Sequence, residues 1–256
     1  MTSNKFLTPN ISIIDTIELI KEKIESKTPF ALTRFGDGEI YVLKKSYSKD
    51  FLETRCKMWD YLYPTEADDF VNDASTIIKK AFVESDVIGL MDANTKVVKI
   101  DYNYNIWSIE KDRAKLWGRN IEDIKICDHM ISRSFELGNI NSMKKLLNGH
   151  SVNIISPNTD ILISKQLEKI LETEVRFTHH SRDVNFRNRG EFLKSFENIK
   201  EDVVLFGVGL QKDYGVILRD DFGKVAIDMG ATMDAWSDII SRPWFRKGEI
   251  QQHLLV

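Results

Sequence analysis

The stretch from Leu32 to Ile40 holds the residues of this chain whose types and spacing best suit chemistry, and it reads Leu-Thr-Arg-Phe-Gly-Asp-Gly-Glu-Ile. Asp37 and Glu39 offer hard carboxylate oxygens of the kind that Mg²⁺ and Mn²⁺ prefer. Arg34 adds a forked donor that suits phosphate. The two glycines between these charges can take positive φ and bring backbone amides close to a ligand. The alternative is a solvated turn between a strand and a helix, but the arginine and the glycines beside the two acids favour a binding site.

Asp92, Arg133 and Asp228 each stand at or shortly after the carboxyl end of a predicted strand. Ligands of open α/β sheets bind beyond these ends, so we expect the three side chains to face the same crevice as the first turn. Arg133 is a second candidate for phosphate binding, and an ordinary surface arginine is the alternative. Asp228 or Asp92 is the candidate for a general base.

A Gly-Val-Gly sequence, Gly207 to Gly209, follows an apolar run and precedes a predicted helix. It is similar to the opening of a dinucleotide-binding turn, in which the helix N-terminus faces phosphate. The third glycine of G-x-G-x-x-G is missing because position 212 is Lys. This sequence therefore supports a nicotinamide site weakly, while a turn that lets the backbone approach a single nucleotide or sugar is still allowed.

The cysteines and histidines do not predict a metal centre. Cys56 and Cys127 are far apart and have no metal-ligand spacing, so we expect two reduced, partly buried thiols. The adjacent His179 and His180 lack soft-ligand partners nearby, which favours a loop. His129 beside Asp128 suggests an acid/base pair, although adjacent side chains rarely point the same way.

Apolar periodicity predicts alternating helices and strands. An apolar run buried on both faces is the mark of a parallel strand, and amphipathic stretches between the runs predict helices. We therefore expect an α/β fold: a Rossmann-like open sheet, mostly parallel, with helices on both faces. The predicted strands are 30–33, 86–91, 124–127, 152–155, 174–178, 202–206 and 224–229.

Length and composition indicate an ordinary globular chain. The 256 residues can bury one substantial core, and we expect a single domain over 1–256. The stretch Asn148 to Ser151 could separate sub-halves 1–148 and 151–256, but it is too short for a flexible linker. The formal net charge of −3 gives no reason to expect nucleic acid as a partner. We expect a cytoplasmic protein, because neither a signal-peptide pattern nor a membrane-spanning run of about 20 apolar residues is present.

Four motifs in this order resemble the GT-D type glycosyltransferases, a bacterial family first described as a domain of unknown function. The resemblance covers about residues 30 to 235, and the first motif is the most specific. The motifs are Thr33-Arg-Phe-Gly-Asp-Gly-Glu39, Ile131-Ser-Arg133, the strand and turn from Val203 to Gly209, and Ala226-Ile-Asp-Met-Gly230.

The resemblance implies a hexosyltransferase in which a D-x-E motif, here Asp37 and Glu39, binds the divalent metal, Mn²⁺ or Mg²⁺. The expected donor is a nucleotide sugar, UDP-sugar foremost, and the expected acceptor is a glycan or glycoprotein of the bacterial surface. A homo-oligomer is compatible with the sequence. The residues expected at the donor are Thr33, Arg34, Phe35, Gly36, Gly38, Arg133, Gly207 and Gly209.

The chain departs from the family pattern in two places. Gly230-Ala231-Thr232 stands where a Gly-His pair is usual, and Tyr214-Gly215 replaces small residues after the glycine turn.

Two other functions would use the same acidic and glycine residues. A metal-dependent phosphohydrolase would release phosphate without an acceptor, and a non-catalytic subunit would bind nucleotide alone.

Overall fold

The structure is a computed structural model that describes residues 5–90, 108–132, 140–158 and 161–236. Two residues of the predicted site, Asp92 and Arg133, lie outside the described residues. None of the described helices has the length and apolar character needed to cross a bilayer.

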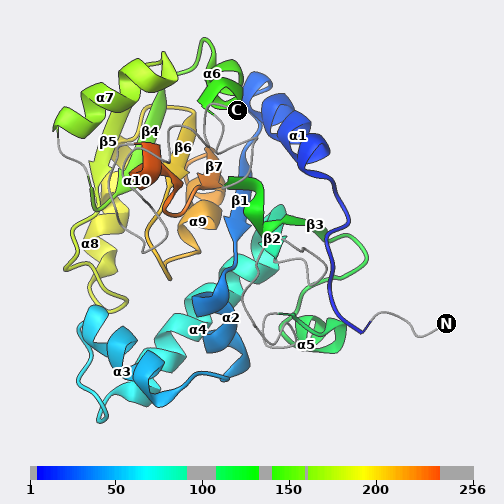
Figure 1. Ribbon diagram of the computed structural model, residues 1–256, viewed down its shortest axis with the longest axis vertical. Coiled ribbons are helices and arrows are strands. Elements are labelled where there is room, and N and C mark those ends of the chain that lie inside the picture. Colours follow the sequence, from blue (N-terminus) through cyan, green and yellow to red (C-terminus); the bar gives the residue numbers. More distant parts are fainter. Residues whose placement is uncertain (1–4, 91–107, 133–139, 159–160, 237–256) are drawn as a thin grey trace.

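A seven-stranded sheet forms the centre of the fold, with the order β3-β2-β1-β7-β6-β4-β5 (Figure 1). Every pair of neighbouring strands is parallel. The predicted open, mostly parallel sheet is therefore confirmed. The strands are β1 (Phe30–Arg34), β2 (Val87–Leu90), β3 (Lys125–Asp128), β4 (Val152–Ser156), β5 (Val175–His179), β6 (Val203–Phe206) and β7 (Val225–Asp228).

Helices lie between and after the strands along the chain. The described α-helices are α1 (Ile13–Glu25), α2 (Asp37–Lys44), α3 (Lys49–Met58), α4 (Ala67–Glu84), α5 (Lys111–Leu116), α6 (Ile140–Leu147), α7 (Ile161–Leu171), α8 (Arg189–Lys194), α9 (Tyr214–Asp220) and α10 (Thr232–Trp236). Two short 3₁₀ segments, His129–Ser132 and Ser195–Asn198, follow β3 and α8.

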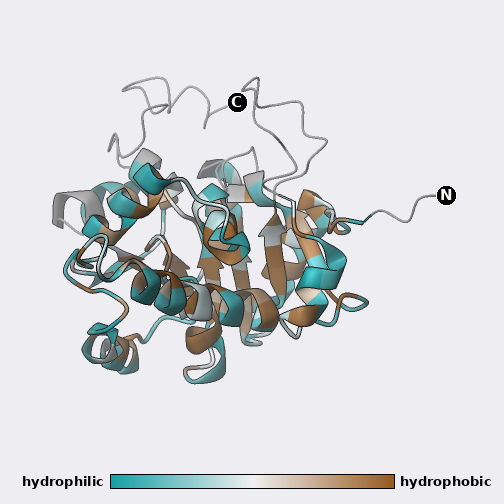
Figure 2. Cartoon of the chain, turned by 90° about the horizontal axis from the view of Figure 1, so that it is seen from below, coloured by the Kyte–Doolittle hydropathy of each residue, from teal (hydrophilic) through white to brown (hydrophobic). Residues whose placement is uncertain are grey.

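Both faces of the sheet are covered by helices, because successive strand side chains point to opposite sides. Along β6, Val203 and Leu205 pack with α1, α6 and α7, whereas Val204 and Phe206 pack with α9 and the residues around α8. Helix α4 contacts α9 and extends that second layer. Figure 2 shows the apolar strands enclosed between these helices, which turn hydrophilic surfaces outward.

The neighbouring strands β1 and β7 lead the chain to opposite faces. Helix α2 follows β1 and packs through Ile40 on the α4 side, whereas α10 follows β7 and packs through Met233 on the α1 side. Adjacent strands whose continuations diverge in this way leave a crevice at their carboxyl ends, which is where ligands of open α/β sheets bind. The register Leu32↔Ile227 joins the two ends of the sequence at this point.

The turns after β6 and β7 meet through glycine at one wall of the crevice. A Cβ atom added to Gly207 would lie 2.2 Å from the carbonyl oxygen of Gly230 and 2.9 Å from Cε of Met233. The first distance is far below van der Waals contact with backbone that cannot rotate away. Position 207 therefore requires glycine for close approach.

We predict that Gly207→Ala lowers the free energy of unfolding by about 2 kcal/mol, because the methyl group forces the two turns apart. Gly190→Ala is the matched control, since a Cβ there meets no atom within 4 Å. That change lies inside helix α8 and should be neutral or stabilising by up to about 1 kcal/mol. Urea unfolding followed by circular dichroism measures both. Equal midpoints for Gly207→Ala and the unmodified protein would contradict the close approach.

Candidate active site at the carboxyl ends of β1 and β7

The first turn of α2 holds the two acids of the D-x-E sequence in different ways. Gly36 is the N-cap of α2. Its backbone N–H donates a hydrogen bond to Oε2 of Glu39, which stands at the third helical position (2.8 Å). Glu39 is buried, whereas Asp37 at the start of the helix is exposed. Backbone N–H groups at a helix N-terminus favour negative charge. The turn thus presents one fixed carboxylate inward and one carboxylate to solvent.

Asp228 ends β7 and is 1% exposed. Its Oδ2 accepts from the backbone N–H of Arg34 (3.1 Å) and from Nζ of Lys212 (2.7 Å), and its Oδ1 accepts from the backbone N–H of Gly230 (3.0 Å). These three donors join the ends of β1 and β7 to the loop after β6. The contacts suit a group that positions the crevice, and they give no support to the prediction that Asp228 is a general base.

Lys212 is buried between the two acids, with its Nζ 2.7 Å from Oδ2 of Asp228 and 3.4 Å from Oε1 of Glu39. Burial alone would lower the pKa of Lys212, but the charges of Asp228 and Glu39 outweigh this effect, so its pKa is raised. The ammonium group therefore stays charged. Lys212 occupies the position where the dinucleotide-binding pattern has its third glycine. This mismatch is the one feature of the sequence that draws attention to Lys212.

Arg34 is the second buried cation of the crevice. Its Nε donates to the backbone carbonyl of His129 (2.8 Å). Burial lowers the pKa of Arg34, and Asp228 and Glu39 oppose this shift. A Cβ atom at Gly230, whose φ is +55°, would lie 2.7 Å from Nη1 of Arg34. The absence of a side chain at Gly230 therefore leaves space for the guanidinium group.

The structure places the predicted donor residues that it describes in three different settings. Arg34, Gly36 and the loop that begins at Gly207 border the crevice. Thr33 instead points toward α9 and bonds the hydroxyl of Ser85 (2.7 Å). Phe35 is fully buried. The predicted donor contacts of Thr33 and Phe35 therefore gain no support from their positions.

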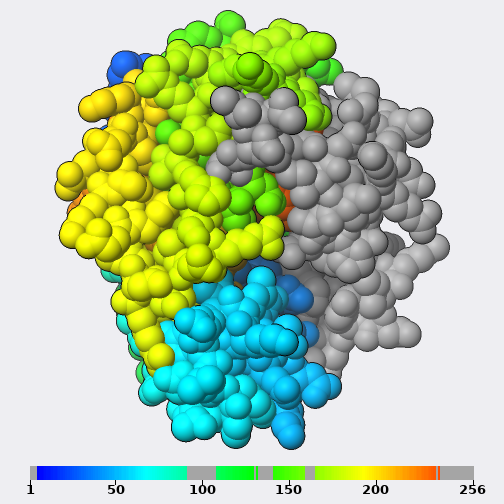
Figure 3. All heavy atoms as spheres, turned by 90° about the vertical axis from the view of Figure 1, so that its left-hand side faces the viewer, coloured from blue at the N-terminus to red at the C-terminus, as the bar shows by residue number. Residues whose placement is uncertain are grey.

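The remaining glycines of the prediction, Gly38 and Gly209, face side chains of α3 and of the residue that follows it. A Cβ atom at Gly38 would lie 3.4 Å from Nη2 of Arg55, and one at Gly209 (φ +65°) would lie 3.3 Å from the ring of Trp59. Trp59 follows α3 and stacks on Phe186, with ring centroids 4.6 Å apart. Figure 3 shows the α3–α4 region, in cyan, lying against the yellow segment that follows β5. The end of α3 thus holds the loop after β6 in place.

A buried polar cluster lies beyond the ends of β5 and β6. Nε2 of His180 lies 3.3 Å from the hydroxyl of Tyr214 and 3.2 Å from Nε2 of Gln211. Burial is the largest influence on His180 and lowers its pKa to about 4, so the imidazole is neutral near neutral pH. Within the described ranges, no group of three or more His, Cys, Asp or Glu side chains is arranged to hold a metal.

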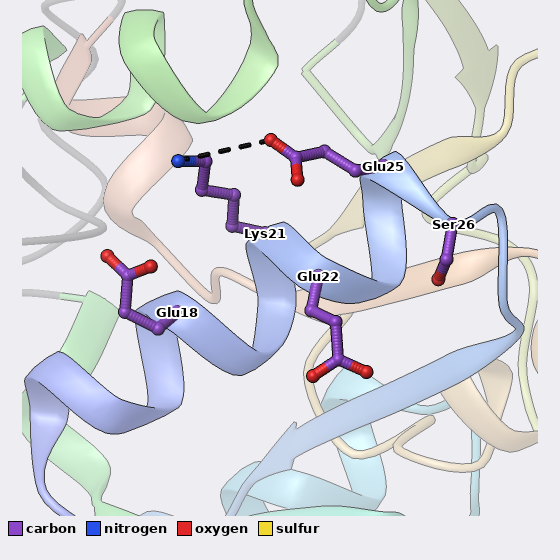
Figure 4. Close-up of a pocket in the computed structure, with 5 residues that line it drawn as sticks. All are labelled: Glu18, Lys21, Glu22, Glu25 and Ser26. Atoms are coloured by element: carbon purple, nitrogen blue, oxygen red, sulfur yellow. Dashed lines mark ion pairs between the residues drawn. The ribbon is translucent and has the colours of Figure 1, made fainter.

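Five polar side chains at the end of α1 line a hollow on its surface (Figure 4). An ion pair between Lys21 and Glu25 (3.9 Å) crosses it. Helix α1 leads into the amino end of β1, whereas the candidate site lies at the carboxyl end of that strand. The residues lining the hollow are Glu18, Lys21, Glu22, Glu25 and Ser26.

Comparison with known proteins points to one family. Residues 12–236 match the model of the GT-D-like family, described as a GT-D fold-like domain. No curated protein matches the chain.

Solved structures of low sequence identity share the fold. One is described as the highly conserved domain of unknown function 1792 with a distinct glycosyltransferase fold; it is 17% identical, with a TM-score of 0.60 over 90% of this chain and 80% of that chain. Another is described as a new glycosyltransferase from Streptococcus sanguinis; it is 14% identical, with a TM-score of 0.54 over 97% of this chain and 94% of that chain. At these identities the likeness shows the fold alone.

We predict that His180 makes stability depend on pH in a defined window. Its pKa is about 4 in the fold against 6.5 for an ordinary histidine. Between these values the unfolded chain binds a proton that the folded chain excludes, so stability falls as the pH drops from about 6.5 toward about 4. The slope from this group is at most about 1.4 kcal/mol per pH unit.

Urea midpoints at about pH 7 and about pH 5 measure this contribution. His180→Gln removes the titrating group, so the variant should lose less stability than the unmodified protein between the two conditions. Identical losses in the two proteins would contradict the burial of a neutral imidazole.

Proposed function

The chain belongs to the GT-D-like family, and from this premise we propose that it is a glycosyltransferase that moves a sugar from a nucleoside-diphosphate sugar to a glycan or glycoprotein acceptor. The donor we propose is a UDP-sugar, and the setting is the assembly of bacterial surface polysaccharide or glycoprotein. The observation that supports this most is the place of the Arg34 to Glu39 turn. It lies at the carboxyl end of β1, where β1 and β7 send the chain to opposite faces.

The charges of the crevice suit a diphosphate that arrives with a cation. Arg34 and Lys212 are balanced by Glu39 and Asp228, all four being buried, so the inner wall carries no excess positive charge. The exposed Asp37 adds a negative charge at the rim. A diphosphate next to Asp37 would therefore meet electrostatic repulsion unless a divalent cation lies between them.

The residues present fit Mn²⁺ or Mg²⁺ shared with the donor, rather than a metal enclosed by protein. Asp37 offers an exposed carboxylate, whereas both oxygens of Glu39 already face donors, the N–H of Gly36 and the ammonium of Lys212. Mg²⁺ is commonly held by one or two carboxylates together with substrate phosphates. When bound, such a cation would neutralise charge on the departing nucleoside diphosphate. We propose Asp37 as the direct ligand and Glu39 as the group that fixes its turn.

The other residues of the crevice act by positioning. Arg34 fixes the loop after β3 through the carbonyl of His129, and Asp228 fixes the end of β1 through the N–H of Arg34. Both contacts are buried, so they hold without substrate. The base that activates the acceptor hydroxyl stays a prediction, with Asp92 and Asp228 as its candidates.

We predict that a nucleoside diphosphate stabilises the protein in the presence of Mn²⁺, because ligands that bind the folded state alone raise the unfolding temperature. A thermal-shift panel of UDP, GDP, CDP and NAD, each with and without Mn²⁺, measures this. A shift with UDP that requires Mn²⁺ supports the transferase. A response to NAD alone would contradict it. Release of phosphate from a nucleotide without an acceptor would favour a phosphohydrolase, and binding without turnover a non-catalytic subunit.

We predict that Asp37→Asn lowers metal-dependent hydrolysis or transfer of the nucleotide sugar by about 100-fold or more, since a neutral amide replaces the charged ligand. The unfolding temperature should fall only slightly, because the exposed side chain loses no more than its favourable interaction with the N-terminus of α2. Glu39→Gln should lower both activity and stability, because the buried carboxylate faces Lys212.

Asp68→Asn is the matched control for Asp37→Asn. Asp68 is also an exposed acid in the first turn of a helix, α4. Its replacement should leave activity unchanged. Equal activity of Asp37→Asn and Asp68→Asn in buffer treated with chelator and then given Mn²⁺ would show that Asp37 binds no metal.

A further inference from the structure

Lys212 is a buried cation for which donor binding at the α2 turn gives no role. Its side chain comes from the loop after β6 and reaches an acid from each of the other two walls, Glu39 after β1 and Asp228 at the end of β7. The residue is 7% exposed, so its charge is directed into the protein rather than toward solvent.

We propose that Lys212 is an internal counter-ion that closes the Glu39 and Asp228 pair to divalent cations, so that a metal binds this crevice only together with the donor diphosphate. The identity of the donor in this proposal rests on the proposed function. The effect of Lys212 on the two acids is a property of the protein alone and is tested without nucleotide.

Lys212 and backbone N–H groups already contact all four carboxylate oxygens of these two acids. The oxygens of Asp228 accept three hydrogen bonds, and those of Glu39 face Gly36 and Lys212. A divalent cation binds carboxylate oxygen at about 2.0–2.2 Å, which is closer than the ammonium lies now. It would therefore have to displace Lys212 and leave a buried charge without its partner, which is strongly unfavourable.

The carboxylate that remains open in the turn is that of Asp37. One exposed carboxylate competes poorly with water for Mg²⁺ or Mn²⁺, which keep most of their hydration shell unless phosphates replace it. The oxygens of a diphosphate supply the missing ligands. Metal and nucleotide should therefore bind with strong positive coupling, and Lys212 is the residue that enforces it by excluding the alternative site.

A purely structural lysine would give a different result. If Lys212 did no more than hold the loop after β6, its removal would lower stability without changing the affinity for metal. If it excludes metal, its removal opens two buried carboxylates, Glu39 and Asp228, and metal affinity rises. The affinity for Mn²⁺ without nucleotide therefore separates the two roles.

The experiment is Mn²⁺ binding measured by electron paramagnetic resonance, in which the signal of free aqueous Mn²⁺ falls on binding. The unmodified protein should bind Mn²⁺ about tenfold more tightly, or better, with UDP than without it. Lys212→Met should bind Mn²⁺ without UDP about tenfold more tightly than the unmodified protein. Lys212→Met combined with Glu39→Gln is the control and should lose this gain.

A second variant covers failure of Lys212→Met to fold. Lys212→Gln keeps both acids, removes the charge that excludes metal and leaves an amide that can still donate a hydrogen bond to Asp228. It should also bind Mn²⁺ more tightly than the unmodified protein. No gain in either variant would overturn the proposal. Once UDP is shown to bind, equal Mn²⁺ affinity of the unmodified protein with and without saturating UDP would overturn it as well.

The Mn²⁺ affinity of the Lys212 variants and the binding of UDP test the role of Lys212 and the donor assignment separately. If UDP does not bind under any condition but removal of Lys212 raises the affinity for Mn²⁺, the role of Lys212 stands and the donor assignment falls. If UDP and Mn²⁺ bind together but removal of Lys212 leaves the affinity for Mn²⁺ unchanged, the donor assignment stands and the role of Lys212 falls.

Discussion

The candidate site depends on the burial of four charged side chains that neutralise one another: Arg34, Glu39, Lys212 and Asp228. Charged groups are costly to remove from water unless each has a close partner and hydrogen bonds. Here Asp228 accepts three hydrogen bonds, and Lys212 lies between the two acids. Loss of any member leaves another charge buried without its partner. The ends of β1 and β7 and the loop after β6 are therefore fixed as one unit before any ligand binds.

This unit explains why the exposed acid lies where it does. Asp37 begins α2 shortly after the end of β1, and the first turn of α2 is held by the hydrogen bond between Glu39 and the N–H of Gly36. Because Glu39 is in turn held by Lys212, the position of Asp37 is set by the inner charges. The sheet brings residues from the two ends of the chain together here through the pairing of β1 with β7. The glycine contact at position 207 completes the wall.

Much of the fold and part of the site follow from the sequence, for physical reasons. Short apolar runs predict the strands because a parallel strand is buried on both faces. The Arg34 to Glu39 turn is predicted at a strand end because three charges in six residues interrupt the apolar run, although two of them, Arg34 and Glu39, are buried in the structure. Side-chain direction is harder to predict: Thr33 points into the layer of α9, although it adjoins Arg34.

The pairing of β1 with β7 has no local signal in the sequence, so the partners of Asp228 were not predictable. In the sequence, Lys212 is notable only because it stands where the dinucleotide-binding pattern has a glycine. Its contacts with Glu39 and Asp228 become visible only in the structure, where the ends of β1, β6 and β7 lie together. The predictions for Asp92 and Arg133 fall outside the described residues and stay open.

Anomalous diffraction from crystals grown with UDP and Mn²⁺ would locate the metal and the diphosphate together. We expect an anomalous peak beside the carboxylate of Asp37, with the diphosphate over the first turn of α2 and Lys212 still bound to Asp228. A nucleotide bound away from the carboxyl ends of β1 and β7 would contradict the proposed function. A metal seated between Glu39 and Asp228, with Lys212 displaced, would contradict the role given to the buried charges.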